Sequence, residues 1–325
     1  NARDKDDAIY AEFPETNQEK GIFCEIWIAI ADVSFHVSAG SCIDQEALRR
    51  GNSTYFFDSV IPMLPEKLSN DLCSLEENKV RNSITLRISL NKYGKKISHK
   101  FIKGRILVKH NCSYEEVENS HQKSESYNSP NNEKQLLFYN LFKANSLLTK
   151  AIPKALNLNI QEPIFSLSEK GDVIDLCQEK DLKSHKIVEN FMITANACVA
   201  ETLSESRLPV IYRVHEPPPT DRLAKLLQRI SLLGIKGTRK KNIKSSDFNQ
   251  ILNLAKTSQL HDVTSLLVLQ AMTQAYYTIR EVGHFGLDLK KYIHFTSPIR
   301  RYTDLFTHRL LSIHLGWSNK NIYQN

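Results

Sequence analysis

Three aspartates stand within four residues near the start of the chain, at Asp4, Asp6 and Asp7. Carboxylates this close repel one another unless a cation or solvent neutralises them. Their oxygens are the ligands that a hard divalent ion such as Mg²⁺, or alternatively Mn²⁺, prefers. The other interpretation is a solvated acidic tip, which is common for short runs of like charge. The three residues by themselves leave both interpretations open.

A second candidate lies in the segment HFTSPIRRY, residues 294–302. Ser297 and Pro298 are typical of the cap and the first position of a helix. Free backbone N–H groups that suit an anion are therefore expected there. Arg300 and Arg301 would lie in the first turn, where the helix dipole disfavours positive charge, and such a conflict often marks a functional site. Two arginines could clamp a phosphate; the alternative is an arginine–carboxylate pair that stabilises the fold.

Aromatic side chains that could stack on nucleic-acid bases occur at Tyr55, Phe56, Phe57 and Tyr114. Bases stack on such rings in proteins that bind single strands, although an aromatic residue more often belongs to the core. Glu189 lies on an expected amphipathic helix, where a lone glutamate is usually part of the solvated face. The roles of these residues stay undecided at this point.

The composition narrows the classes of protein to consider. Of the 325 residues, 41% are apolar and 24% are charged, which is typical of a globular chain. No apolar run reaches the roughly 18 residues of a membrane-spanning helix, and no signal segment stands at the start. Because the chain begins at Asn1, we expect a fragment of a longer product. The net charge of +7 suits an anionic partner. The six cysteines form no C-x-x-C pair, which argues against zinc or redox motifs and favours a reducing cytoplasm.

The hydrophobic pattern predicts an α+β fold, in which a largely antiparallel, mixed sheet is flanked by long helices. Strands are expected at residues 22–30, 83–90, 98–108, 164–166 and 173–177. The second and third of these should form a hairpin, and so should the last two. Residues 61–70 should form an ordered loop, because Pro62 and Pro65 disfavour both helix and central strand.

Helices are expected at residues 43–50, 134–149, 185–206, 220–233, 247–256 and 261–280, and from Pro298 to about 315. Ser113 and Glu116 form a capping box that begins another helix. Residues 119–133 are polar and low in complexity, so they are expected to form a mobile surface insertion. No repeat and no clean linker is visible, which predicts one domain over residues 1–325.

Taken together, these motifs resemble the RNB catalytic domain of the ribonuclease II and ribonuclease R exoribonucleases, and ribonuclease R more closely. The resemblance covers nearly the whole chain, in family order. The matching segments are RDKDDAIY, WIAIADVSFHVSAG, IPMLPEKLSNDLCSL, IYRVHEPP, GHFGL and YIHFTSPIRRYTDLFTHR. The resemblance implies the RNB fold, with helices and sheet enclosing a channel for single-stranded RNA.

The resemblance also implies roles for individual residues. Four aspartates in a D-x5-D-x-D-D pattern hold magnesium at the scissile phosphate, and Asp4, Asp6 and Asp7 match the last three. The first aspartate would precede Asn1. Asp6 and Arg300 are the expected catalytic residues, because Arg300 matches the arginine that steadies the scissile phosphate. Tyr55 matches the aromatic residue that clamps a base in the channel.

Further residues are expected to bind the RNA. Tyr114 and Glu189 match positions near the ribose of the 3′-terminal nucleotides, where a 2′-OH separates RNA from DNA. Ser297 and Arg301 are expected to contribute from the helix start. One departure is Asn190, which stands where an acidic residue is usual. The flanking OB-fold RNA-binding domains and a catalytic glutamate beyond the last helix are also expected to lie outside this chain.

The activity implied is magnesium-dependent, processive 3′→5′ hydrolysis of single-stranded RNA to nucleoside 5′-monophosphates. A cytoplasmic monomer without DNA cleavage or membrane association is expected. One alternative is a catalytically impaired remnant that still binds RNA. Another is a scaffold in which the aspartates and arginines only form buried salt bridges.

Overall fold

The computed structural model describes residues 4–15, 21–56, 59–127, 132–158, 163–167, 173–178, 182–235, 243–257 and 260–318. The chain divides into two compact units. Unit 1 comprises Asn1–Ile152, Asp181–Val210 and Ile293–Asn325, and unit 2 comprises Pro153–Lys180 and Ile211–Tyr292. Within the described residues, no helix is both long enough and apolar enough to cross a membrane.

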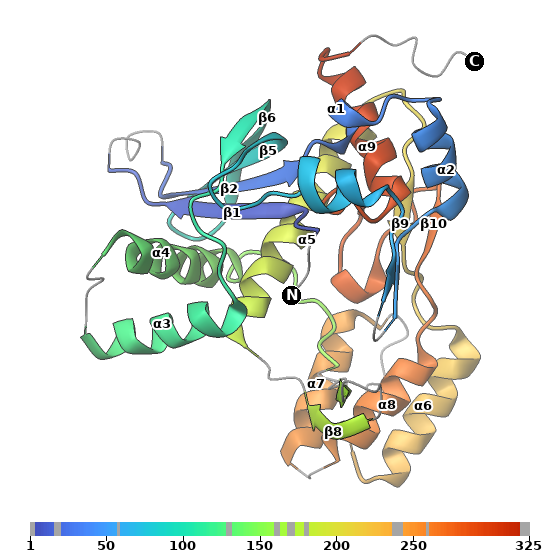
Figure 1. The fold of residues 1–325 in the computed structure, drawn as a ribbon. Coiled ribbons are helices and arrows are strands. Elements are labelled where there is room, and N and C mark those ends of the chain that lie inside the picture. Colours follow the sequence, from blue (N-terminus) through green and yellow to red (C-terminus); the bar gives the residue numbers. More distant parts are fainter. Residues whose placement is uncertain are drawn as a thin grey trace. The chain divides into compact units, whose positions relative to one another are not determined.

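Unit 1 is built around a four-stranded antiparallel sheet with the strand order β1-β2-β5-β6 (Figure 1). The strands are β1 (Asp7–Glu12), β2 (Cys24–Ala31), β5 (Val80–Leu90) and β6 (Lys96–Leu107). Successive side chains of a strand point to opposite faces. One face carries buried branched residues such as Ile28 and Leu86, which pair across β2 and β5. The sequence predicted three of these four strands, but it gave no signal for β1.

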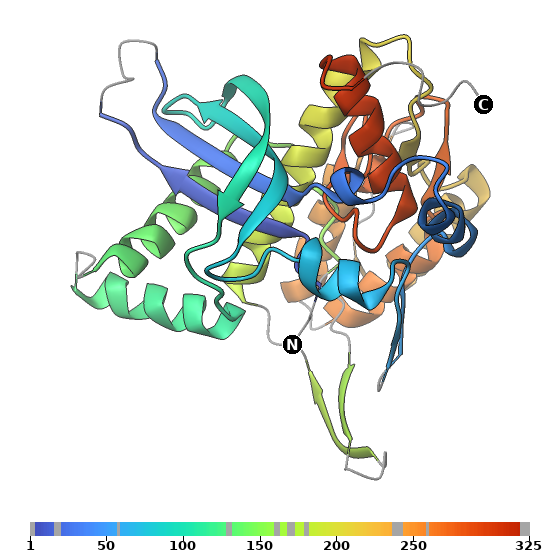
Figure 2. The ribbon, with the colours of Figure 1, turned by 45° about the horizontal axis from the view of Figure 1, so that its top comes forward.

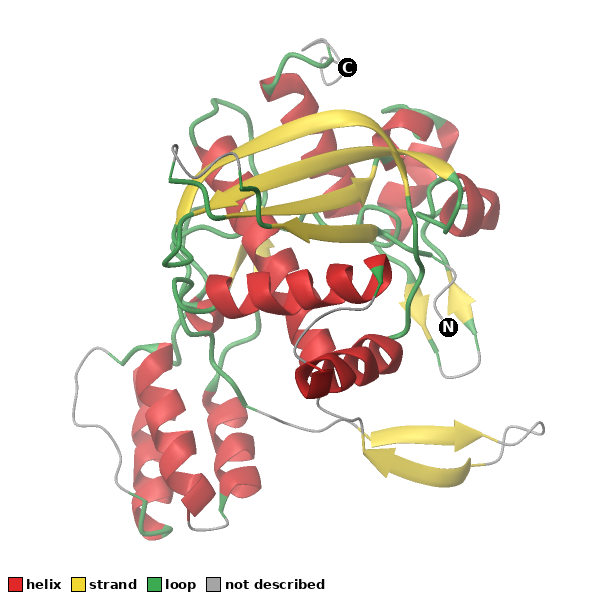
Figure 3. Cartoon of the chain, turned by 90° about the vertical axis from the view of Figure 1, so that its left-hand side faces the viewer, coloured by secondary structure: helices red, strands yellow, loops and turns green. Residues whose placement is uncertain are grey.

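Long helices pack beside and behind this sheet. The helices are α3 (Tyr114–Tyr127), α4 (Glu133–Leu148), α5 (Lys183–Ser204) and α9 (Tyr302–His314). Helix α4 packs beside the edge strand β1, and α5 contacts both β2 and α9; in Figure 2, α9 lies to the right of the sheet. The ring of Phe101 on β6 lies 6.4 Å from that of Phe295, which precedes α9. The opposite face of the sheet is turned towards the viewer in Figure 3, and among the described residues no helix crosses in front of it.

Local signals explain where several helices begin. The Ser113 hydroxyl accepts a hydrogen bond from Glu116 N–H at 3.1 Å and caps α3, as predicted. Asn132 caps α4 in the same way through Gln135 N–H, at 2.9 Å. At the hairpin between β5 and β6, Gly94 has φ 79°, and a Cβ there would lie 1.9 Å from the Leu147 carbonyl oxygen. Only glycine therefore allows the hairpin to approach α4 this closely.

The segment between β2 and β5 differs from the prediction in one respect. It contains α1 (Val33–His36), α2 (Cys42–Arg50), the short strands β3 (Thr54–Tyr55) and β4 (Val60–Ile61), and a π-helical turn η2 (Leu68–Leu72). The expected loop over residues 61–70 is therefore partly helical. Pro65 lies before the helical turn, where its carbonyl oxygen accepts hydrogen bonds from the N–H groups of Leu68 and Ser69.

In the regions of α3 and α8 the structure differs from the predicted extent of the segments. Residues 119–127 continue α3 and do not form a surface insertion, and residues 128–131 lie outside the described residues. The ring of His121 on α3 stacks on Phe142 of α4 at 3.7 Å, which explains the added length. The helix predicted over residues 261–280 ends at Ala271, because Tyr276–Thr278 forms a strand instead.

Unit 2 has a helical core and short strands. Its elements are the hairpin β7 (Pro163–Leu167) and β8 (Val173–Gln178), strands β9 (Tyr212–Val214) and β10 (Tyr276–Thr278), the 3-10 turn η3 (Phe285–Leu287), and helices α6 (Thr220–Leu232), α7 (Ser245–Thr257) and α8 (His261–Ala271). At η3, Gly286 N–H donates to Nδ1 of His215 at 2.9 Å. The His215 ring lies 5.2 Å from that of His284.

Candidate active site

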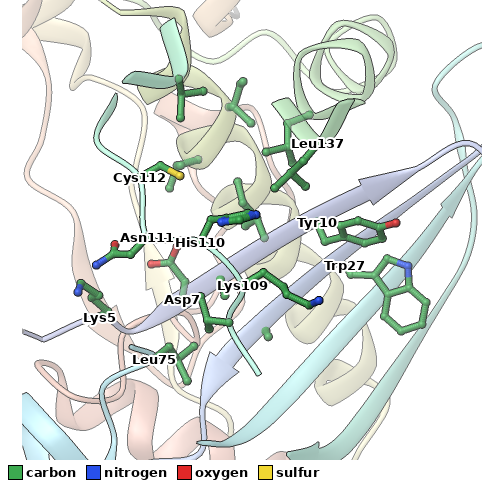
Figure 4. Close-up of a pocket in the computed structure, with 18 of the residues that line it drawn as sticks. Lys5, Asp7, Tyr10, Trp27, Leu75, Lys109, His110, Asn111, Cys112 and Leu137 are labelled. Carbon is green, nitrogen blue, oxygen red and sulfur yellow. The ribbon is translucent and has the colours of Figure 1, made fainter. Parts of the chain in front are cut away.

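Unit 1 contains a cavity of about 850 Å³ whose wall carries the aspartates of the sequence motif. Figure 4 places Asp7 near the start of β1, and the following labelled lining residues on either side of it: Lys5, Tyr10, Trp27, Lys109 and Asn111. The wall also includes Asp4, Asp6, Tyr55, Tyr114 and Arg300. Six of the nine residues for which the resemblance to the RNB family implies a role therefore lie at one cavity.

Backbone hydrogen bonds hold the aspartate segment in place. Ala31 N–H, at the end of β2, donates to the carbonyl oxygen of Asp6 at 2.8 Å. On the other side, Leu75 N–H donates to the carbonyl oxygen of Lys5 at 3.0 Å. Lys5 N–H in turn donates to the hydroxyl of Ser74 at 3.1 Å. The segment is thus fixed between the sheet and the 74–75 turn.

Asp6 is buried and contacts the SPIRRY motif directly. Its Oδ1 accepts a hydrogen bond from Ile299 N–H at 2.9 Å, and its Oδ2 lies 3.5 Å from Nε of Arg300. The Arg300 side chain is 47% exposed, whereas that of Asp6 is 6% exposed. Burial raises the pKa of Asp6 well above its ordinary value, and the Ile299 hydrogen bond and the Arg300 charge oppose that effect.

The other two aspartates have different environments. The Tyr55 hydroxyl donates to Oδ2 of Asp4 at 2.8 Å, which joins the aromatic residue to the acidic segment. Burial raises the pKa of Asp7 to about 6, and Arg300 lowers it in part. Asp7 is thus a carboxylate that is short of positive charge, and a cation near it would stabilise its ionised form.

Helix α9 begins later than the sequence predicts. Residues 298–300 form a turn, Arg301 is the cap residue, and the first helical residue is Tyr302. Ser297 is therefore not the cap of this helix, and its N–H donates to Oδ1 of the buried Asp304 at 2.8 Å. The expected placement of Arg300 and Arg301 in the first turn was wrong, because both precede the helix.

The two arginines of this turn have different partners. Nη2 of Arg300 donates to the Ser297 hydroxyl at 3.2 Å, and the rest of its side chain reaches Asp6 at the cavity. Nη2 of Arg301 donates to Oδ1 of Asp304 at 2.7 Å. Neither Ser297 nor Arg301 lines the cavity. Arg300 is thus the arginine that faces the aspartates.

Of the two residues expected near the ribose, the structure brings one to the cavity. Tyr114 lines the wall, and its ring meets that of His185 edge-on at 4.0 Å. Glu189 is exposed, forms an ion pair with Lys186 at 2.7 Å, and does not line the cavity. The amide of Asn190 donates to Oδ1 of Asn145 at 2.9 Å.

The aromatic run at Tyr55 is divided in the structure. Tyr55 is 49% exposed and lines the cavity, whereas Phe56 is 56% exposed and does not. Phe57 lies outside the described residues.

Sequence reasoning missed several basic residues that line the cavity. Lys109 and His110 line the cavity from the segment that joins β6 to α3, and Lys5 lies between the aspartates. The only available signal was the basic run at the end of the predicted strand. These side chains give the acidic site a partly basic wall that suits an anionic polymer.

The carboxylates have the right chemistry for a hard cation, but they do not converge on one point. Over the described ranges, no group of three or more His, Cys, Asp or Glu side chains is arranged to hold a metal ion. Asp4 is bonded to Tyr55, and Asp6 to Ile299. Burial raises the pKa of Asp6 and of Asp7, so a cation placed beside them would stabilise their ionised forms.

The sequence has many relatives among known proteins. Ribonuclease R of Thermotoga maritima is 36% identical over 323 residues, which is 97% of this chain and 44% of that protein. Ribonuclease R of Escherichia coli is 32% identical over 318 residues, which is 95% of this chain and 38% of that protein. The chain thus spans less than half the length of these relatives.

Solved structures are similar as well. RNase R of Mycoplasma genitalium in complex with ribose methylated single-stranded RNA has a TM-score of 0.89 at 30% identity, over 98% of this chain and 50% of that chain. Yeast Ssd1, a pseudonuclease, has a TM-score of 0.76 at 18% identity, over 96% of this chain and 38% of that chain, and so shares the fold alone. The model of the RNB domain matches residues 1–316. The chain therefore belongs to the RNB domain family.

Proposed function

We propose that this chain is the catalytic domain of an exoribonuclease that degrades single-stranded RNA processively from the 3′ end to nucleoside 5′-monophosphates. The observation that carries the proposal is the meeting of Asp6, Asp7 and Arg300 at one cavity in a chain of the RNB domain family. The relatives named ribonuclease R favour an enzyme over a remnant that only binds RNA.

The RNB and ribonuclease R family is one of divalent-metal-dependent nucleases. We propose that Asp4, Asp6 and Asp7 hold Mg²⁺, or Mn²⁺, because all three offer oxygen ligands at the cavity. When bound, the ion would activate water and neutralise charge on the phosphate.

Arg300 is proposed to bind the scissile phosphate. Its half-exposed guanidinium contacts Asp6 over only part of its surface, so that donors remain for an anion in the cavity. Ser297 acts through Arg300, because its buried hydroxyl accepts a hydrogen bond from Nη2 of that residue. Arg301 is proposed to contact the RNA backbone.

Three further residues are proposed to bind the bases and the sugars of the RNA. Tyr55 is proposed to stack on a base, with its ring fixed by the hydroxyl bond to Asp4. Tyr114 and Glu189 are proposed to read the 2′-OH, so that DNA is not cleaved. The protein is further proposed to be a monomer that acts in a reducing cytoplasm. The five cysteines whose side chains the structure describes are free, in agreement with such a compartment.

The direct test follows the degradation of a 5′-labelled single-stranded RNA, with Mg²⁺ and with a chelator. We expect stepwise shortening from the 3′ end, release of mononucleotides, and no cleavage without metal. Asp6→Asn should reduce the cleavage rate by about a hundredfold or more and leave RNA affinity nearly unchanged. Asparagine keeps an oxygen that can accept the Ile299 hydrogen bond.

Asp262→Asn is the matched control, because the side chain of Asp262 is fully exposed and lies in unit 2. It should cleave RNA at the parental rate. Near-normal turnover by Asp6→Asn would contradict the metal assignment. RNA binding without any metal-dependent cleavage by the parent would instead establish the non-catalytic alternative.

A further inference from the structure

A row of four side chains crosses the sheet of unit 1 on the face opposite to the one that carries Ile28 and Leu86. Tyr10 pairs with Trp27, Trp27 with Arg87, and Arg87 with Lys100, one residue from each strand. Paired residues of neighbouring strands lie on the same face of a sheet. We call these four residues the sheet platform. The row carries two large rings and two cations, and no helix of the described ranges crosses in front of this face in the view of Figure 3.

The platform is ordered by its own contacts. Nε1 of Trp27 donates to Oε1 of Glu12 at 3.2 Å, and the hydroxyl of Tyr10 donates to Oε2 of Glu12 at 3.4 Å. The guanidinium of Arg87 lies over the Trp27 ring, 5.4 Å from its centroid. The rings therefore need little further ordering before a flat ligand stacks on them, which lowers the entropic cost of binding.

The same face remains accessible. Tyr10 is 46% exposed, the side chain of Arg87 is 37% exposed, and Lys100 is exposed as well. A nucleic-acid base can stack on an aromatic ring or on a guanidinium plane. The platform offers both types of surface side by side.

The platform is continuous with the candidate active site. Tyr10 and Trp27 belong to the wall of the same cavity as Asp7 and Arg300. In Figure 4, the side chain of Lys109 lies between Asp7 and the two rings. Between them the sheet has a row of small residues, since Ala8 pairs with Ala29. A polymer whose end lies at Asp7 can therefore leave the cavity across the platform.

The local charges point to stacking as the main source of affinity. Arg87 is 3.9 Å from the carboxylate of Glu25, and Glu12 lies beside both rings. Glu25 offsets part of the charge of Arg87, and Glu12 adds negative charge beside the two rings. Binding here should consequently depend less on ionic strength than binding through phosphate contacts does.

We propose that the sheet platform binds single-stranded RNA on the 5′ side of the nucleotides in the cavity, with bases stacked on Tyr10 and on the Trp27–Arg87 pair. This inference rests on the proposed function, because it assumes that RNA occupies the cavity. It adds a second RNA subsite, which only substrates long enough to leave the cavity reach.

The test compares two RNAs, one of about 4 nucleotides and one of about 15, a range that spans the site sizes of single-strand binding modules. Affinities are measured by fluorescence anisotropy in a chelator, so that the RNA is not cleaved. Tyr10→Ala should weaken binding of the long RNA by about tenfold and leave the short RNA unaffected. Tyr10→Phe keeps the ring and should bind both RNAs like the parent.

Tyr93→Ala is the matched control, because Tyr93 is 68% exposed and lies at the β5–β6 turn outside the cavity wall. It should change neither affinity. An unchanged affinity of Tyr10→Ala for the long RNA would overturn the inference. An equal loss for both RNAs would also overturn it, because the residue would then act on the cavity or on the fold.

Trp27 gives an independent measurement, because the chain has only two tryptophans. In a Trp317→Phe background, the long RNA should quench the fluorescence of Trp27 and the short RNA should not. Bound long RNA without quenching would contradict the stacking. If the parent binds neither RNA, the proposed function itself fails, which is distinct from failure of the platform alone.

Discussion

The Asp6 carboxylate lies 3.5 Å from the Arg300 guanidinium, although the two residues come from opposite ends of the sequence. The acid is buried and the arginine is half exposed, so that the arginine is the partner that can turn towards a substrate. An arginine beside a carboxylate in this way can exchange part of that contact for a phosphate.

The geometry of Arg300 should matter more than its charge. Arg300→Lys keeps the charge and loses the planar fork, so RNA should bind nearly as well but be cleaved about a hundredfold more slowly. Arg301→Lys should have a smaller effect on the rate, because Arg301 contacts Asp304 and does not line the cavity. Single-turnover cleavage and RNA affinity at fixed salt would be measured for both. Parental cleavage by Arg300→Lys would show that Arg300 only holds the strand.

The ratio of RNA to DNA cleavage rates tests the roles of Tyr114 and Glu189, the two residues proposed to lie near the ribose. Glu189→Ala should narrow the ratio of RNA to DNA cleavage rates on the order of tenfold, through loss of a charged hydrogen-bond acceptor. Lys186→Ala is the control, because it breaks the ion pair but keeps the carboxylate. It should leave the ratio unchanged. If only Tyr114→Ala alters the ratio, the 2′-OH is read from the cavity wall and Glu189 is a surface residue.

Gly286 should be intolerant of any side chain. A Cβ there would lie 2.9 Å from Nδ1 of His215, the atom that accepts the hydrogen bond from Gly286 N–H. Gly286→Ala should lower the free energy of unfolding by about 1–3 kcal/mol. Gly104→Ala in β6 is the control, since a Cβ there meets no atom within 4 Å. Equal melting temperatures of the two variants would refute this account of unit 2.

His284 should make unit 2 sensitive to acid. Burial, with the charges of His215 and Arg213, lowers the pKa of His284 to about 4. The folded state thus favours the neutral ring, and its contribution is fully present above the ordinary pKa of about 6.5 and lost as the pH falls towards 4. Protonation of His284 should lower the free energy of unfolding by at most about 3 kcal/mol.

The measurement is urea unfolding at a series of pH values. His284→Asn keeps an acceptor for Leu287 N–H and removes the titrating ring. Its stability should fall less than that of the parent between pH about 6.5 and 4. Parallel pH profiles of the two proteins would mean that other groups cause the loss.

Elements with a strong local pattern were predictable from the sequence. The continuous apolar run of β2 and the hairpin of β5 and β6 lie close to their expected positions. Strand β1 was missed because its sequence, DAIYAE, begins inside the acidic motif and is too short to show a period. Helix α8 ends early because Tyr276 pairs with Val214, a contact between segments that are distant in sequence.

The start of α9, next to the candidate site, also depends on contacts that the local sequence does not reveal. Ser297 and Pro298 have the local features of a helix start. However, the buried Asp304 accepts a hydrogen bond from the Ser297 N–H, and Asp6 accepts one from the Ile299 N–H. Both contacts depend on tertiary structure. The resemblance to the RNB family indicated which aspartates and which arginine matter, whereas Lys109 and His110 carry no motif and emerged only from the cavity wall.

The hydrogen bond between Ile299 and Asp6 joins residues 293 positions apart, which has a consequence for synthesis on the ribosome. Within this segment, translation delivers the aspartates long before the SPIRRY turn, and domains begin to fold while the chain grows. The nascent chain therefore carries Asp6 through the synthesis of the intervening residues without the arginine that pairs with it. A polypeptide interrupted between these two points lacks the contact between Asp6 and Arg300, so the candidate site is not assembled in it.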